Sequence, residues 1–193
     1  MIEELIKKNR SVRRFYQDQK VDLETLKGLV DLGRLSASGA NFQPLKYIVS
    51  CDPDQNASIF SCLAWAAYLK DWQGPEEGER PPAYIIVLGD SQISKDFGCD
   101  HGIASQSILL GATEKGFGGC MIGSINREAL RKHLKIPEHL KILLVLAVGK
   151  PKEEVVIEPV GDDGSIRYWR DEKGVHHLPK RDLNDIIVAS FEG

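Results

Sequence analysis

An unbroken apolar run at residues 142–148 is the feature that most constrains how this 193-residue chain can fold. A strand with one face in water alternates apolar and polar side chains, whereas this run does not alternate and therefore predicts a strand buried on both faces. Gly149 and Pro151 end the run. It is far too short to cross a bilayer, which takes about 20 residues. Other elements of the chain must therefore cover this strand.

Helical and strand-like patterns alternate irregularly along the rest of the sequence. Helices are predicted at residues 2–6, after a cap at Asp22, at 59–68, at 103–115, at 127–134 after a cap at Asn126, and after a cap at Asp182. Further strands are predicted at residues 46–50, 84–88 and 167–170. With about four short strands, the pattern predicts one α+β domain over residues 1–193. Glycine and proline near residues 70–82 predict a lid-like insertion within it.

Charge and cysteine usage exclude several classes of protein. With 25 Lys plus Arg against 28 Asp plus Glu, the net charge of −3 argues against a nucleic-acid binder that works by bulk charge. The cysteines at positions 51, 62, 99 and 120 form no C-x-x-C pair and no zinc-like spacing. The first residues do not resemble a signal peptide, because Glu3 and Glu4 follow Met1 and no apolar stretch appears there. We therefore expect reduced thiols, a cytoplasmic location, and no metal, nucleic-acid or membrane partner.

Two basic segments could hold an anion. Arg10, Ser11, Arg13 and Arg14 lie within five positions, and guanidinium forks match phosphate oxygens two at a time. Lys180 and Arg181, near the other end of the chain, matter only if folding brings them beside Arg10. The alternative for both segments is ordinary solvated surface charge.

Two segments rich in small residues could approach a flat ligand. The first is 38–44, in which the amides of Asn41 and Gln43 suit a polar ring edge or a polyol chain. The second is 116–123, which lacks the dinucleotide-binding pattern because Met121 stands where glycine is required. The alternatives are a polar connecting loop for the first segment and a tight turn between buried elements for the second.

Taken in order, these segments resemble the FMN-dependent nitroreductase family. The resemblance rests on residues 10–15, 38–44, the helix at 100–116, residues 118–123 and residues 179–181, and it covers the chain from residue 1 to about 188. The family resemblance implies an α+β sandwich with a central mixed sheet flanked by helices. It also implies an intertwined homodimer with two FMN molecules at the interface.

The resemblance further implies which residues bind the cofactor. Arg10, Ser11 and Arg13 would hold the phosphate and the pyrimidine side of the flavin, with Lys180 and Arg181 closing on the phosphate. Ser38, Gly39, Asn41 and Gln43 would reach the flavin from the other subunit. Met121, Ile122 and Gly123 would lie against the ring, with a backbone N–H near N5.

By the same resemblance, the activity is NAD(P)H-dependent reduction of nitroaromatic, quinone or similar electron-poor acceptors. Hydride from NADH or NADPH would pass to flavin N5 and then to the acceptor at one shared face, which predicts ping-pong kinetics. No catalytic acid–base side chain is expected, since the cofactor-binding residues that the resemblance implies include neither histidine nor carboxylate. The alternatives are a flavin carrier or sensor with little turnover, or enone reduction, dehalogenation or flavin breakdown on the same fold.

Overall fold

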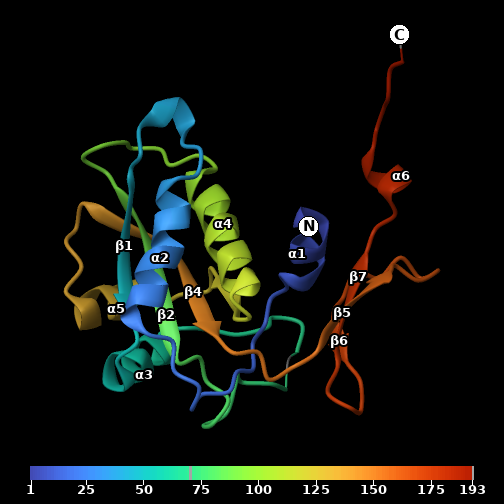
Figure 1. The fold of residues 1–193 in the computed structure, drawn as a ribbon, viewed down its shortest axis with the longest axis horizontal. Helices are drawn as coiled ribbons and strands as arrows, with labels where there is room; N and C mark the ends of the chain where they lie inside the picture. Colours follow the sequence, from blue (N-terminus) through green and yellow to red (C-terminus); the bar gives the residue numbers. More distant parts are fainter. Residues whose placement is uncertain (70, 193) are drawn as a thin grey trace.

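A four-stranded sheet in the order β1-β2-β4-β3 forms the centre of the computed structural model, which describes residues 1–69 and 71–192 (Figure 1). Its strands are β1 (Leu45–Ser50), β2 (Ala83–Asp90), β3 (Gly118–Ile122) and β4 (Leu140–Gly149). Neighbouring strands all pair antiparallel, and the parallel contact at the β3 edge is a single bridge between Ser11 and Gly119. The α+β class is confirmed, with parallel pairing at this sheet reduced to that bridge.

Strand β2 is buried on both faces along its whole length, and β4 is buried on both faces from Val145 to Gly149, as the apolar run predicts. Within that run, Leu143 and Leu144 are only half-buried. Along β2, Ala83, Ile85 and Val87 point to one core cluster, whereas Tyr84, Ile86 and Leu88 point to the other. On β4, Leu146 and Val148 face the first cluster and Val145 and Ala147 the second. This alternation is the two-residue period of a pleated strand, here with an apolar core on each side.

Helices cover each face of the sheet. On one face lie α2 (Leu23–Arg34) and α4 (Asp100–Glu114), and on the other lie α3 (Pro53–Ser61) and α5 (Arg127–Leu134) (Figure 1). The predicted caps are present: the carboxylate of Asp22 accepts from Thr25 N at 2.7 Å, and the amide oxygen of Asn126 accepts from Ala129 N at 3.1 Å. Local capping therefore starts α2 and α5 where the sequence predicts.

The helix predicted at residues 59–68 is wrong in position. Asp52 caps α3 by accepting from Gln55 N at 2.8 Å, Pro53 occupies the first turn, and the helix ends before Cys62. The chain then leaves helical geometry, with Ala66 at a φ of 40°. An Asp-Pro pair is a helix start signal that outweighs the apolar spacing farther on.

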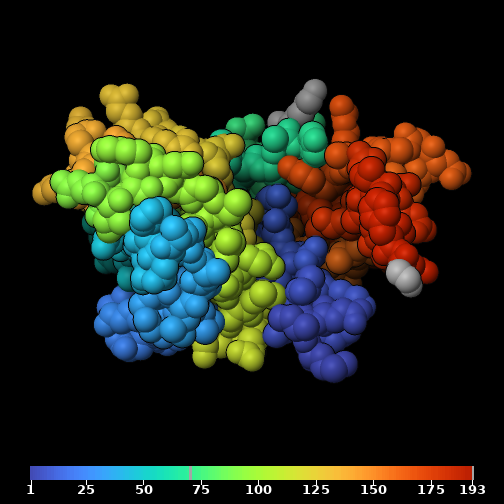
Figure 2. Space-filling model, turned by 90° about the horizontal axis from the view of Figure 1, so that it is seen from above, coloured from blue at the N-terminus to red at the C-terminus, as the bar shows by residue number. Residues whose placement is uncertain are grey.

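The C-terminal segment builds a second sheet away from the central one (Figure 1). There β7 (His176–Lys180) pairs parallel with β5 (Val155–Pro159) and antiparallel with the short β6 (Trp169–Arg170). The expected total of about four strands was therefore too low. Beyond β7, the four-residue α6 (Leu183–Ile186) and the chain end extend outward. Figure 2 shows the N-terminal segment, which begins with α1 (Ile2–Lys8), seated between α4 and this C-terminal part.

The described residues of the expected lid near residues 70–82 make close contacts with other parts of the chain. Residue 70 lies outside the described residues. Gly74 packs so closely on Trp65 that an added Cβ would lie 2.7 Å from Trp65 Cδ1. Glu79 forms an ion pair with Arg14 at 2.5 Å and with Lys152 at 3.1 Å. Within residues 1–69 and 71–192, none of the helices combines the length and apolar character needed to cross a bilayer.

Candidate functional site

A cavity of about 380 Å³ brings the two ends of the sequence together. We call it the cationic cavity because Arg10, Arg13 and Lys180 line it, together with Ser11 and Met121. The two arginines come from residues 10–16, which follow α1 and which we call the arginine segment, and the lysine comes from the end of β7. The condition that Lys180 must fold beside Arg10 is therefore met. Arg181 is exposed and is not among the residues that line this cavity.

Arg10 has a buried side-chain donor that points to an anionic ligand in the cationic cavity. Burial lowers the pKa of its guanidinium, because desolvation penalises the charged form. Its Nη2 donates to the carbonyl of Ile6, but its buried Nε has no hydrogen-bond partner among the described residues. A buried charged donor without an acceptor is costly unless a ligand supplies one. The residues of this cavity thus fit an anionic group such as the phosphate of FMN.

Arg13 stands between the cationic cavity and an adjoining cavity of about 140 Å³. Both are lined by Arg13, Met121 and Tyr168, and the adjoining one also by Trp65, Cys120, Ile122, Gly123 and Ser124. The Arg13 guanidinium lies 5.0 Å from the centre of the Tyr168 ring, and its Nη1 donates to Ser11 O at 3.3 Å. The three predicted residues Met121, Ile122 and Gly123 therefore line the same cavity as Arg13.

Close packing at β3 explains the glycines that precede Met121. An added Cβ at Gly119 would lie 2.5 Å from the carbonyl oxygen of Ala147 and 2.6 Å from Leu109 Cδ2. The carbonyl of Gly119 accepts from Val12 N at 2.9 Å, which docks the arginine segment on the sheet edge. From Gly118 onward this segment is strand β3, not the tight turn that the sequence left open.

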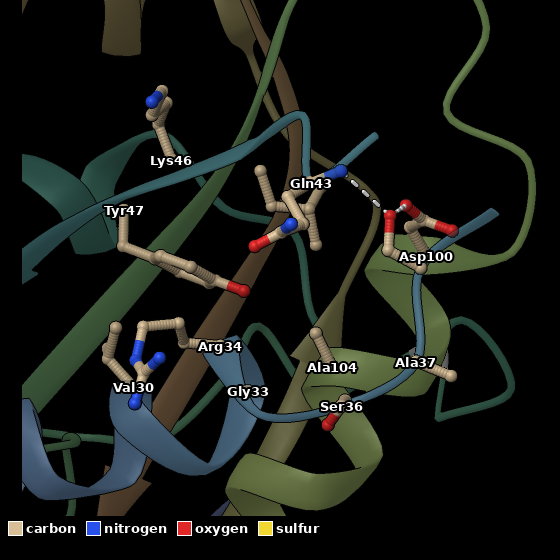
Figure 3. Close-up of a pocket in the computed structure, with 12 residues that line it drawn as sticks. Val30, Gly33, Arg34, Ser36, Ala37, Gln43, Lys46, Tyr47, Asp100 and Ala104 are labelled. Carbon is tan, nitrogen blue, oxygen red and sulfur yellow. Dashed lines mark hydrogen bonds between the residues drawn. The ribbon is translucent and has the colours of Figure 1, made fainter. Parts of the chain in front are cut away.

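The segment 38–43 lies at a different cavity, of about 430 Å³, between α2, α4 and β1 (Figure 3). Ser38 and Gln43 line it, whereas Gly39 and Asn41 are exposed in the short 3₁₀ turn η1 (Gly39–Asn41). The buried carboxylate of Asp100 fixes the loop by accepting from Ser38 Oγ at 2.6 Å and Gly39 N at 2.9 Å. This cavity shares no lining residue with the cationic cavity, so one chain does not bring the two predicted halves together.

Sequence reasoning missed three residues beside the cationic cavity: Tyr168, His176 and Glu153. His176 is fully buried, and its Nε2 lies 3.5 Å from Arg13 Nη1. Burial, then the charge of Arg13, lowers the pKa of His176 to about 4, so the ring is neutral near pH 7. None of the three lies in a spacing that signals a site.

Among the described residues, no three His, Cys, Asp or Glu side chains gather in a way that could hold a metal ion. The four cysteines are free thiols, with Cys62 and Cys120 buried. Burial raises the pKa of the Cys120 thiol, which keeps it protonated.

Known proteins resemble this chain in sequence and in fold. The sequence model of the nitroreductase family matches residues 6–150. A Methanothermobacter thermautotrophicus protein, provisionally named NADH dehydrogenase/NAD(P)H nitroreductase, is 32% identical over 78% of this chain and 77% of its own length. The crystal structure of a Parabacteroides distasonis protein with the same provisional name is 28% identical, has a TM-score of 0.65, and covers 78% of this chain and 86% of that one.

A solved Clostridium difficile protein, titled an FMN-dependent nitroreductase, shares the fold at a TM-score of 0.67 and 23% identity, over 80% of this chain and 89% of its own. The family match spans the central sheet, the helices on both of its faces and the arginine segment. The chain therefore belongs to the nitroreductase family and is an oxidoreductase.

Proposed function

We propose that this protein is an FMN-dependent NAD(P)H oxidoreductase that reduces nitroaromatic, quinone or similar electron-poor acceptors by a ping-pong reaction. The observation that carries the proposal is the cationic cavity, in which Arg10, Arg13 and Lys180 converge from opposite ends of the sequence. The buried, unpartnered Nε of Arg10 supports an anionic occupant there.

In this proposal each residue has a separate task. Arg10, Ser11 and Lys180 hold the phosphate by charge-assisted hydrogen bonds. Arg181, which does not line the cavity, closes on the phosphate only if its exposed side chain turns toward it. Met121, Ile122 and Gly123 support the ring beside Arg13, whose positive charge faces the pyrimidine side. Bound FMN would supply the hydride chemistry between the nicotinamide and the acceptor. No side chain of the chain is assigned as a general acid or base.

We further propose that the protein acts as an intertwined homodimer, in which Ser38, Gly39, Asn41 and Gln43 reach the partner's flavin. Two observations support this. These residues lie away from the cationic cavity of their own chain. The C-terminal end also exposes large apolar side chains that an isolated chain leaves in water: Leu183, Ile186, Ile187, Val188 and Phe191.

The dimer is tested by diluting the flavin-loaded protein in an analytical ultracentrifuge with absorbance detection. Release of flavin in step with dissociation supports a site built from two chains. A stable monomer that keeps its flavin contradicts it.

The activity is tested first by the absorbance spectrum of the purified protein, before and after anaerobic mixing with NADH or NADPH. We expect a flavin spectrum that bleaches within seconds. Parallel-line initial-rate kinetics with varied NAD(P)H and acceptor would support one shared face. Intersecting lines would contradict it, and a flavin that does not bleach would favour a carrier or sensor.

A further inference from the structure

The arginine segment runs along the sheet edge without belonging to a regular strand, so each of its backbone amides needs an acceptor of its own. Val12 N donates to Gly119 O, Phe15 N to Glu79 O and Tyr16 N to Lys150 O, each at 2.9 Å. The amides of Arg13 and Arg14 lie between these and have no backbone acceptor among residues 1–69 and 71–192. Both donate to the same side-chain oxygen, Oε1 of Glu153, with the Arg14 N distance at 3.2 Å.

Glu153 is built into this position. Its side chain is only 1% exposed, although it follows directly after the exposed Lys152. Its second oxygen accepts from Arg170 Nη2 at 2.7 Å, and the Arg170 guanidinium lies 4.4 Å from the centre of the Trp72 ring. A carboxylate is buried in proteins when it is paired and hydrogen-bonded, and both conditions hold here.

We propose that Glu153 is a positioning residue for the cofactor site: it fixes the backbone at Arg13 and thereby aims the Arg13 guanidinium at the ring end of the bound flavin. The inference rests on the proposed function. Residue 153 lies beyond the stretch 6–150 that the family model matches, so the family match does not assign it a role.

The geometry shows how Glu153 acts through Arg13. The Arg13 guanidinium borders both the cationic cavity and the adjoining one. It is steered by Ser11 O of its own segment, by the neutral ring of His176 and by the face of Tyr168. Those three contacts presuppose that the Arg13 backbone stays in place. Without the carboxylate, the amides of Arg13 and Arg14 lose their acceptor. The segment then shifts until water can accept from both amides, and the Arg13 guanidinium moves with it.

The test compares Glu153→Ala with the conservative Glu153→Gln, which keeps an oxygen for the two amides. The matched control is Glu154→Ala, because Glu154 is adjacent but exposed. For each folded variant, the Kd for FMN is measured by quenching of flavin fluorescence, and the midpoint potential of the bound flavin by anaerobic dye titration. Circular dichroism checks that the variant is native at the assay temperature.

We expect Glu153→Ala to raise the Kd for FMN at least tenfold. A displaced Arg13 should weaken binding of the reduced flavin tenfold more than that of the oxidised one, which lowers the potential by about 30 mV for a two-electron couple. Glu153→Gln should restore most of both values, and Glu154→Ala should match the wild type. A purely structural role would lower the melting temperature and leave the Kd and the potential of the folded protein unchanged, and that result overturns the proposal.

If Glu153→Ala does not fold, Glu153→Asp takes its place, because its carboxylate is one methylene group too short to reach the two amides. A raised Kd and a lowered potential in Glu153→Asp, together with protection of the Arg13 and Arg14 amides from hydrogen exchange in the wild type, would support the role. Freely exchanging amides in the wild type, or a Kd and a potential in Glu153→Asp equal to those of the wild type, would overturn it. A wild-type protein that binds no FMN fails at an earlier step and contradicts the proposed function itself.

Discussion

The central sheet with its helices and the C-terminal segment from residue 151 are held together by different physics. In the central part, apolar side chains from both faces of β2 and β4 are completely buried. In the C-terminal segment, fixed positions come from polar contacts such as Arg170 with Glu153 and His177 with Glu158, while its last apolar side chains are exposed. The first part is stable through its own core, whereas the second depends on the surface against which it lies. The cationic cavity is where the two parts meet.

The largest expected difference comes from deleting apolar side chains in each part. Leu146→Ala, at a fully buried position of β4, should lower the free energy of unfolding by about 2–5 kcal/mol, because it leaves a cavity between the sheet and the helices α2 and α4 on that face. Ile166→Ala, at a position 45% exposed between β5 and β6, should stay within about 0.5 kcal/mol of the wild type. Urea denaturation followed by circular dichroism measures both. Equal losses would contradict the contrast.

The next effect concerns the cavity where the parts meet. Arg10→Ala should weaken FMN binding by about 2–3 kcal/mol, since the phosphate loses a charge-assisted partner. Lys132→Ala, on the exposed surface of α5, is the control and should bind FMN normally. Flavin occupancy after dialysis gives a first measure and titration gives the Kd. Unchanged occupancy in Arg10→Ala would remove the phosphate assignment.

Helix caps give a smaller contrast between the same two parts. Asp22 caps the twelve-residue α2, which buries Leu26 and Leu29 against the sheet, so Asp22→Ala should cost about 1 kcal/mol of unfolding free energy. Asp182 caps the four-residue α6, which has no buried residue within one chain, so Asp182→Ala should change the stability of the dissociated monomer by less than about 0.5 kcal/mol. Thermal unfolding of the two variants side by side measures the difference. A larger loss in Asp182→Ala would show that α6 is packed in solution.

The smallest effects are those of pH on two adjacent histidines of β7. Hydrogen bonding to Glu158 and then to Asp171 raises the pKa of His177 above 6.5. The contribution of His177 to the stability of the fold is therefore complete below pH 6.5 and is lost as the pH rises through the pKa of the folded state. Burial lowers the pKa of His176 to about 4, so its contribution is present above pH 6.5 and is lost as the pH falls toward 4.

An NMR titration of the two imidazole rings checks both directions. We expect the ring of His177 to titrate above 6.5, and that of His176 to titrate near 4 or to remain neutral until the C-terminal sheet opens. Rings that both titrate at the ordinary value would mean that this sheet is not formed in solution.

The sequence predicted best what local signals control. The apolar run at 142–148 predicted a doubly buried strand, and the caps at Asp22 and Asn126 predicted two helix starts, because each rests on neighbouring residues alone. The helix near residue 60 was misplaced because apolar spacing was given more weight than the Asp52-Pro53 start signal.

The site was predictable only in part. Arg10, Ser11 and Arg13 stand out because they lie close together in the sequence, whereas the sequence alone did not say whether Lys180 lies beside them. Glu153, Tyr168 and His176 could not be found, because their importance comes from contacts across the whole length of the chain. A carboxylate that accepts from two backbone amides leaves no pattern in the sequence.

The most direct test of the cationic cavity is to compare the affinities of the flavin-free protein for FMN and for riboflavin, which lacks the phosphate, by fluorescence titration at fixed ionic strength. If Arg10 and Lys180 hold the phosphate, FMN should bind at least tenfold more tightly, and Arg10→Ala should remove most of that difference. Equal affinity for the two flavins in the wild-type protein would contradict the account.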